Sequence, residues 1–221
     1  TAAFSNPDGS GKPSPRGRVA AYAWGRDYHA VLPEHMRELI VFIEKLVGAP
    51  FPHREYTDTG PLLERDLAQR AGLGWVGKNS CLINPSLGSF FFVSEILLGL
   101  EIDPDLPFPY DRCGKCTRCQ DACPTHCILP DRTIDARHCL SYLTIELKGA
   151  VPMEMRSQLG QWVFGCDICQ DVCPWNAHRV NRKADTSFKP FRGAPEPELA
   201  SELHLTPQDF SLKFSQSPLK R

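Results

Sequence analysis

The sequence predicts an α+β protein, and two features of the chain carry this prediction. Strand-like and helix-like stretches alternate over the first hundred of the 221 residues, a pattern typical of α/β and α+β domains. The part that follows contains two cysteine runs, within Cys113–Ile128 and Phe164–Asn176. A chain of this length has room for one large domain or two small ones.

Hydrophobic periodicity and turn residues define the elements of the first part. Arg18–Trp24 has the composition of a strand. Apolar residues then recur at three- and four-residue steps over Leu32–Val47, which predicts an amphipathic helix that ends at Gly48. Phe51–Tyr56 is predicted to be a second strand. The stretch PLLERDLAQRAG, residues 61–72, is predicted to be a short helix that begins at its proline.

The later elements are shorter. Cys81–Asn84 and Phe90–Leu98 are predicted to be strands. The proline-rich segment Asp103–Asp111 is predicted to be a linker into the cysteine-rich part. Thr206–Leu212 is predicted to be a short helix.

Composition and charge exclude several classes of protein. Hydrophobic residues make up 42% of the chain and charged residues 23%, which is ordinary for a globular protein. The formal net charge of −1 gives no overall basic field for nucleic acid, so such a partner would need local basic patches. The longest apolar stretch, Phe90–Leu100, is too short to span a bilayer, and no signal peptide is recognisable. We therefore expect a cytoplasmic protein with no membrane partner.

The ten cysteines favour metal clusters over disulfides. Disulfide frameworks suit small secreted chains, and this chain carries no export signal. Paired Cys-x2-Cys units can also form structural zinc sites with four thiolate ligands. The first run, however, is a full Cys-x2-Cys-x2-Cys-x3-Cys-Pro, the bacterial-ferredoxin spacing whose fourth cysteine binds the other cluster. The spacing predicts a ferredoxin-like domain with two [4Fe–4S] clusters.

Counting ligands under this rule gives two complete sets of four. The second run has Val163 where its first cysteine should stand, and Cys139, between the runs, is the natural substitute. Cys81 and Cys127 are left over and are expected to be buried small apolar residues. The predicted first set is Cys113, Cys116, Cys119 and Cys173. The predicted second set is Cys123, Cys139, Cys166 and Cys169.

Polar residues before the cysteine runs allow structural or chemical interpretations. Asp58, in the stretch YTDTGP, is placed to cap the helix that follows it. Asp27, in GRDYH, is a natural turn former, and His29 is expected to be structural. The glycines of residues 72–85 do not have the spacing of a nucleotide phosphate site, but they could let the backbone approach a large flat ligand.

Several stretches together resemble one family. YAWGRDYH, DTGPLLERDLAQRAGLGWVGKNSCLINP, the first cysteine run, CLSYLTIE and FGCDICQDVCPWN occur in the order found in epoxyqueuosine reductases. The resemblance covers residues 18–176, and DTGP and SYLTIE have no reason to accompany a generic ferredoxin. One departure is Ile168, in CDIC, where the family commonly has an acidic residue.

The resemblance implies a fold, a reaction and roles for individual residues. It implies a cobalamin-binding catalytic α/β domain over residues 1–104, the two-cluster domain over 105–182, and a linker with the start of a helical repeat region over 183–221. The chain opens without Met and ends on SPLKR, so we expect a fragment truncated at both ends. The family reduces epoxyqueuosine in tRNA to queuosine, with cob(I)alamin attacking the epoxide and the clusters relaying electrons. Asp58 would be the proton donor. The residues expected to line the corrin are Ala21, Tyr22, Asp58, Leu82, Phe92, Val93 and Ser141.

The implied partners are tRNA carrying epoxyqueuosine and an external electron donor, and the protein is expected to be a monomer. Basic residues near the clusters could face the phosphate backbone, and these are Lys78, Arg112, Lys115 and Arg118. Two alternatives stay open at this point. One is a cobalamin-dependent reductive dehalogenase-like enzyme, and the other is a ferredoxin-like electron-transfer subunit without an active site of its own.

Overall fold

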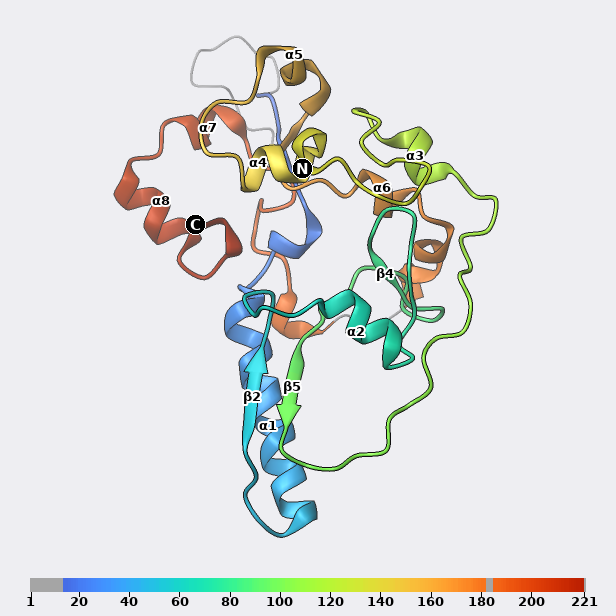
Figure 1. Ribbon diagram of the computed structural model, residues 1–221. Coiled ribbons are helices and arrows are strands. Elements are labelled where there is room, and N and C mark those ends of the chain that lie inside the picture. The colour runs from blue at the N-terminus through green and yellow to red at the C-terminus, as the bar shows by residue number, and fades with distance from the viewer. Residues whose placement is uncertain (1–13, 182–184, 221) are drawn as a thin grey trace.

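The computed structural model describes residues 14–181 and 185–220 as a mixed helix and strand fold of short elements (Figure 1). Three two-stranded sheets form within these residues, and they pair β1 with β6, β2 with β5 and β3 with β4. The prediction of a mixed α and β protein is confirmed at this level. No helix in the described residues is both long enough and apolar enough to cross a membrane.

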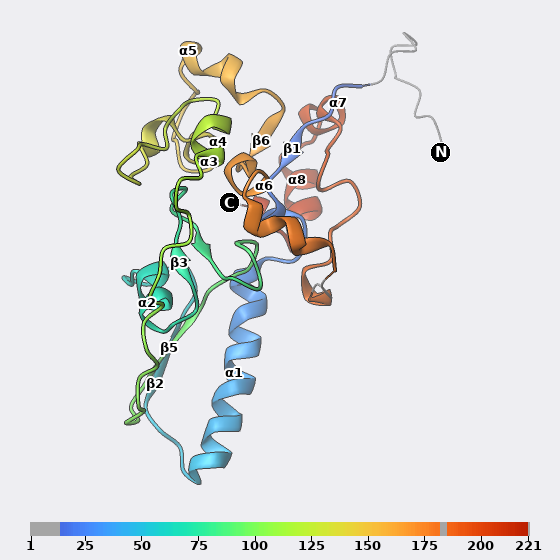
Figure 2. The ribbon, with the colours of Figure 1, turned by 90° about the vertical axis from the view of Figure 1, so that its right-hand side faces the viewer.

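The longest element is α1, Tyr28–Val47, which projects away from the cysteine-rich part (Figure 2). The Asp27 side chain caps its first turn by accepting the His29 N–H, and Gly48 ends it with a φ of 83°. The left-handed conformation at this position favours glycine. The predicted amphipathic helix is confirmed. Its apolar residues divide into a buried stripe and an exposed group, and the exposed group includes Leu39, Phe42 and Leu46.

An antiparallel pair of strands lies beside α1 in both ribbon views (Figures 1 and 2). Strand β2, His53–Tyr56, pairs antiparallel with β5, Glu95–Leu98, so that Tyr56 lies opposite Glu95. Between these strands the chain forms one helix and a second antiparallel pair. These elements are α2 (Glu64–Arg70), β3 (Trp75–Val76) and β4 (Leu82–Ile83).

The other end of the molecule is held by the parallel pair of β1, Arg18–Val19, with β6, Trp162–Phe164. A buried apolar cluster lies at this pair and joins it to the helices around it. Its members are Ala20, Leu140, Leu143, Met155 and Trp162. The core therefore joins the start of the described chain to the region between the two cysteine runs.

Short helices complete the fold, and the chain end returns to its beginning. The remaining α-helices are α3 (Arg118–Ala122), α4 (Leu140–Ile145), α5 (Met153–Arg156), α6 (Ile168–Asp171), α7 (Leu199–Leu203) and α8 (Pro207–Phe214). The 3₁₀-helical segments are Ala21–Ala23, Ala136–His138, Ser157–Leu159, Pro174–Asn181, Thr186–Phe188 and Pro218–Lys220. Close to the end of the chain, the buried Ser217 hydroxyl donates to the Ala23 carbonyl at 3.3 Å.

Several predicted elements have different bounds in the structure, and for three of them the difference is large. The predicted strand Arg18–Trp24 stops after Val19, because the Ala21 N–H donates to the Asp167 side chain at 2.6 Å. The predicted strand Phe90–Leu98 is reduced to β5. Ahead of β5, the Ser89 N–H bonds to Asn176 and the Phe92 ring stacks on Tyr28.

The helix predicted from Pro61 instead begins at Glu64, with Leu63 at the N-cap position and no side-chain cap. The predicted strands at residues 51–56 and 81–84 are confirmed as the shorter β2 and β4. The predicted helix after Thr206 is confirmed as α8. The Thr206 hydroxyl accepts the Asp209 N–H at 3.1 Å there, as an N-cap should.

Glu95 at the start of β5 predicts a measurable pH effect on stability. Both of its carboxylate oxygens are buried. Burial first, and the charge of Glu64 second, raise the pKa of Glu95 from 4.5 to about 7. The folded protein therefore keeps this proton at a pH where the unfolded chain has lost it. As a result, the free energy of unfolding falls as the pH rises from 4.5 to about 7.

Glu95→Gln should remove this dependence. After allowance for solvent screening, we expect the wild type to lose about 1 kcal/mol relative to Glu95→Gln between pH 5 and pH 8. Urea unfolding midpoints at the two pH values measure this loss. Glu101→Gln, at an exposed position just beyond β5, is the matched control and should follow the wild type. The same pH response in the wild type and Glu95→Gln would contradict the prediction.

Candidate functional site

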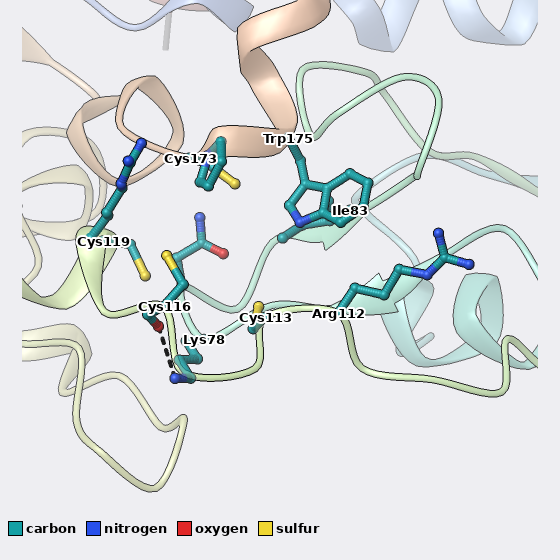
Figure 3. Close-up of a pocket in the computed structure, with 11 residues that line it drawn as sticks. Lys78, Ile83, Arg112, Cys113, Cys116, Cys119, Cys173 and Trp175 are labelled. Atoms are coloured by element: carbon teal, nitrogen blue, oxygen red, sulfur yellow. Dashed lines mark hydrogen bonds between the residues drawn. The ribbon is translucent and has the colours of Figure 1, made fainter.

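The first predicted cysteine set lies around one cavity (Figure 3). Cys113, Cys116 and Cys119 come from the loop before α3 and its first turn, and Cys173 follows α6. Helices α3 and α6 pack against each other, which brings the last cysteine of the second run to the first run. The structure thus brings together the four residues that the spacing predicts as one set.

The loop of the first set is held from outside by β3 and the turn that follows it. Lys78 Nζ donates to the carbonyl oxygens of Gly114 and Cys116, each at 2.8 Å. Trp75 Nε1 donates to Cys113 Sγ at 3.4 Å. Through its two hydrogen bonds, Lys78 anchors the cysteine loop.

Burial, with the nearby charges of Cys113 and Cys116, raises the pKa values of the Cys119 and Cys173 thiols.

The second predicted set is also brought together. Burial raises the pKa of the Cys166 thiol to about 12, and the neighbouring Cys139 and Cys123 charges add to the rise. Cys169 is a charge neighbour of Cys166 as well. Cys123 from the first run and Cys139 from between the runs pack in one cluster with Cys169 of the second run.

The two left-over cysteines lie against this second set. The buried Cys127 has its Sγ 3.5 Å from Cys123 Sγ. Hydrogen bonds from Cys127 lower the pKa of Cys123 to about 4 and that of Cys139 to about 6. A hydrogen bond with Cys81 raises the pKa of Cys169. Sequence reasoning missed this arrangement, although the four-residue step from Cys123 to Cys127 was a signal for it.

The eight set members do not meet at a single point. In the described part of the chain, no group of three or more His, Cys, Asp or Glu side chains is placed to hold one metal ion. The first set instead surrounds a cavity that Ile83 and Trp175 also line. Four thiols around one cavity form a donor set that suits an iron–sulfur cluster, and Lys78, Asn79, Arg112 and Arg118 also line this cavity.

The glycines between α2 and β4 serve the packing of the chain. A Cβ on Gly74 would stand 2.1 Å from the Ile83 carbonyl oxygen, and one on Gly77 would stand 2.6 Å from the Ile83 side chain. Both glycines are required because β3 and β4 approach closely. The close packing against Leu82–Ile83 accounts for these two glycines, and the expectation that the glycines of this stretch admit a flat ligand stays a prediction.

Asp58 lies on a strained loop between β2 and α2. Its φ of 58° is unusual for a residue other than glycine, and such strain is concentrated at functional sites. Its N–H donates to Glu64 Oε1 at 2.5 Å, and the Thr59 N–H donates to the Thr57 carbonyl at 2.6 Å. Because Leu63 is the N-cap of α2 and no side chain caps that helix, the helix-cap interpretation of Asp58 is wrong. The Asp58 side chain remains 56% exposed.

Aromatic side chains surround the Asp58 carboxyl group on the α1 side. The Tyr28 hydroxyl donates to Asp58 Oδ2 at 2.6 Å, and His29 Nε2 lies 3.7 Å from the same oxygen. The Tyr28 ring stacks on Phe92 with a centroid separation of 4.7 Å and meets Tyr22 edge-on at 6.1 Å. Sequence reasoning did not single out Tyr28, although its neighbours Asp27 and His29 were noted.

The residues expected to line the corrin lie at three places in the fold. Ala21, Tyr22, Phe92 and Val93 lie in or beside the aromatic group around Asp58. Ser141 lies in α4, two residues after Cys139. Leu82 lies in β4 and is buried.

The two cysteine sets and the packed α3–α6 pair define the class of the cysteine-rich part, a two-cluster iron–sulfur domain. Residues 112–176 match the family model described as a 4Fe-4S double cluster binding domain. Residues 2–59 match the model described as epoxyqueuosine reductase QueG, DUF1730. The second match contains α1 and ends just after Asp58.

Known relatives identify the family as a whole. An epoxyqueuosine reductase of Synechocystis sp. is 42% identical over 96% of this chain and 73% of its own length. One of Cyclobacterium marinum is 45% identical over 92% of this chain and 64% of its own length. A crystal structure of epoxyqueuosine reductase with an epoxyqueuosine-modified tRNA-Tyr stem loop matches at a TM-score of 0.84. It is 33% identical, over 94% of this chain and 56% of the other. The chain belongs to the epoxyqueuosine reductase family, and it spans between half and three quarters of the length of these relatives.

The division of the cysteines gives a direct test. Anaerobic reconstitution of the wild type should yield about eight iron and eight sulfide per chain. Cys139→Ala should lose roughly half of each, because one set then has three thiolates. Iron and sulfide analysis together with electron paramagnetic resonance of the reduced protein measures this loss.

Cys127→Ala and Cys81→Ala are the matched controls, since both residues lie beside the second set but are not needed to complete it. Both variants should keep two clusters. Two intact clusters in Cys139→Ala, or the loss of one in Cys127→Ala, would contradict the assignment.

Proposed function

We propose that this protein reduces epoxyqueuosine in tRNA to queuosine, using cobalamin and two [4Fe–4S] clusters. The observation that carries the proposal is the strained, half-exposed Asp58 beside an aromatic wall, on a chain that also gathers eight cysteines in two sets of four. The family relationship supports the reaction, and the solved relative with a modified tRNA stem loop supports tRNA as the substrate.

The residues around Asp58 suit a large bound group. The Thr57 hydroxyl is buried and has no hydrogen-bond partner among the described residues, which leaves a polar atom for a ligand or water to satisfy. Tyr28 and Phe92 offer a stacked apolar surface beside it. The residues that would hold cobalamin are Ala21, Tyr22, Asp58, Leu82, Phe92, Val93 and Ser141.

Conversion of the epoxide to the alkene consumes two electrons and two protons and releases one water. When bound, cobalamin supplies the nucleophile that opens the strained ring, and the clusters supply single electrons. The task of the chain is to place a proton at the departing oxygen. Asp58 carries out this task as a general acid, and its anchored backbone and the bond from Tyr28 fix where the carboxyl group lies.

The part of the chain after residue 183 packs on the first part. The Gly17 N–H donates to the Pro197 carbonyl at 2.8 Å, and the Asp27 N–H donates to the Gln216 carbonyl at 2.7 Å. The proposed domain boundaries lie between residues 104 and 105 and between residues 182 and 183. The last segment packs on the catalytic domain through these hydrogen bonds. The cytoplasmic setting, the external electron donor and the monomeric state are parts of the same proposal.

Substrate binding is assigned to basic residues near the first cysteine set. Arg112 and Arg118 border the cavity of that set, and Lys115 is exposed on its loop. The Arg112 guanidinium lies 5.5 Å from the Phe108 ring centroid and 6.0 Å from that of Trp175, which orients it. We do not include Lys78 among the proposed tRNA-binding residues, because its ammonium donates to two carbonyls of the cysteine loop.

Asp58→Asn tests the acid. The change keeps the size of the side chain but removes its proton, so turnover of epoxyqueuosine should fall by roughly two to four orders of magnitude. Cobalamin should still bind and still be reduced, because neither step needs an acid there. A single-turnover assay on the full-length protein with pre-reduced cobalamin measures this effect.

Asp66→Asn, on the exposed side of α2, is the control and removes only a surface pair with Arg70. Near-normal turnover in Asp58→Asn would remove the acid assignment. A full-length protein that binds no cobalamin would favour a simple electron carrier over an enzyme.

Charge reversal tests the tRNA surface. Changing Arg112, Lys115 and Arg118 together to Glu should weaken binding of a tRNA stem loop at least tenfold and flatten its dependence on salt concentration. Fluorescence anisotropy at two salt concentrations measures both effects, and iron analysis confirms that the clusters remain.

Reversal of Arg37, Lys45 and Lys148, which are exposed elsewhere, is the control of equal charge. The prediction fails if the two triple variants lose the same affinity.

A further inference from the structure

Beside Asp58, three consecutive residues at the start of α1 form a polar network. Asp27 is 3% exposed, and one of its oxygens, Oδ1, lies 3.0 Å from the His29 main-chain nitrogen and 2.8 Å from His29 Nδ1. The other ring nitrogen, His29 Nε2, lies 3.7 Å from Asp58 Oδ2. The Tyr28 hydroxyl holds the same Asp58 oxygen at 2.6 Å.

The buried carboxylate decides which nitrogen of His29 carries the proton. A carboxylate only accepts hydrogen bonds, so Nδ1 at 2.8 Å from Asp27 is the protonated nitrogen. In the neutral ring, Nε2 then has a lone pair directed toward the Asp58 side. In the charged ring, Nε2–H is directed at Asp58, and the Asp27 carboxylate stabilises the positive charge.

A purely structural role accounts for only part of this arrangement. As the N-cap of α1, Asp27 needs to accept only the main-chain N–H of His29. The stacking of His29 on Tyr28, with ring centroids 4.0 Å apart, fixes the plane of the imidazole. Neither contact requires Nε2 to face a carboxyl group from a different loop. This alignment places a titratable group behind the proposed acid.

The distance is suited to a proton path and too long for a direct hydrogen bond. A separation of 3.7 Å exceeds hydrogen-bond range, but one water or a small shift of the Asp58 loop closes it. The Asp58 side chain is 56% exposed and the His29 side chain only 17%. A cofactor and substrate placed over Asp58 would cover its solvent side and leave the His29 side for proton return.

We propose that His29, oriented by Asp27, is a positioning residue that returns a proton to Asp58 after each turnover, while Tyr28 holds the acceptor oxygen. The inference rests on the proposed function. Asp58 gives its proton to the departing epoxide oxygen and becomes a carboxylate. The charged His29 ring passes its Nε2 proton to Asp58 Oδ2 and becomes the neutral ring protonated at Nδ1. It then takes a proton at Nε2 from solvent, so no oxidant or reductant is needed.

The first test compares successive turnovers in full-length protein loaded with cobalamin and clusters. In His29→Gln the first turnover should stay within about threefold of wild type, because the return path acts only after Asp58 has given its proton. Later turnovers should slow by roughly ten- to a hundredfold, since the return path is lost. His35→Gln, an exposed change on the same helix, should match the wild type in both phases.

Two further measurements separate proton return from structural support. In His29→Ala, millimolar imidazole should restore later turnovers several-fold without changing the first. Nitrogen NMR of the wild type without substrate should show a His29 ring protonated at Nδ1. Asp27→Asn, which keeps a helix cap, should lose that preference.

Each outcome decides something. Equal slowing of first and later turnovers in His29→Gln, or no rescue by imidazole, would overturn the inference and leave the proposed function intact. A neutral His29 ring protonated at Nε2 and not at Nδ1 in the wild type would do the same. A wild type that performs no turnover, with tRNA and both cofactors bound, would remove the proposed function and the inference together.

Discussion

The exchange of one cysteine between the two runs is the constraint on which the rest of the structure depends. Cys173 has to reach the first set and Cys123 the second, so α3 and α6 must pack side by side. The turn between β3 and β4 then joins both sets. Lys78 binds main-chain carbonyls of the first, and Asn79 Nδ2 donates to the Cys169 carbonyl of the second at 3.3 Å. Hydrogen bonds from this one turn thus help to fix the positions of the two cysteine sets relative to each other.

Helix α2 carries this rigidity to the proposed acid. Its first two residues bind two different loops, the one that carries Asp58 and the turn that binds the cysteine sets. Glu64 accepts the Asp58 N–H, and Arg65 donates to the Ser80 carbonyl at 2.5 Å, in the turn that holds the cysteine sets. A strained φ at Asp58 costs about 1–3 kcal/mol and persists only where the surroundings impose it. The short helix α2 supplies that support through Glu64, its first residue, which accepts the Asp58 N–H.

The sequence allowed prediction of contacts set by spacing and failed for contacts set by partners distant in the chain. Cysteine spacing, with Cys139 as the substitute, predicted two sets of four residues, whose role as cluster ligands stays a prediction, and periodicity predicted α1 with its glycine end. The early end of β1 could not be predicted, because Asp167, far along the chain, binds the Ala21 N–H. Lys78 looked like a phosphate ligand because its carbonyl partners lie 36 and 38 residues away. The proposed corrin contacts remain predictions, and Leu82 shows the difficulty, since a motif position does not reveal that a side chain is buried.

The start of α1 combines two requirements that are usually met in different places. A helix N-cap holds a carboxylate in a fixed position, because its oxygen must meet the main-chain N–H groups of the first turn. At Asp27 the same fixed oxygen also meets the ring of His29, so helix formation itself sets the orientation of the imidazole. Tyr28, between them in sequence, reaches the Asp58 oxygen that His29 also faces. The three adjacent residues that begin α1 thereby also position the proposed acid. A change that disturbs the first turn of α1 would therefore also disturb the geometry at Asp58.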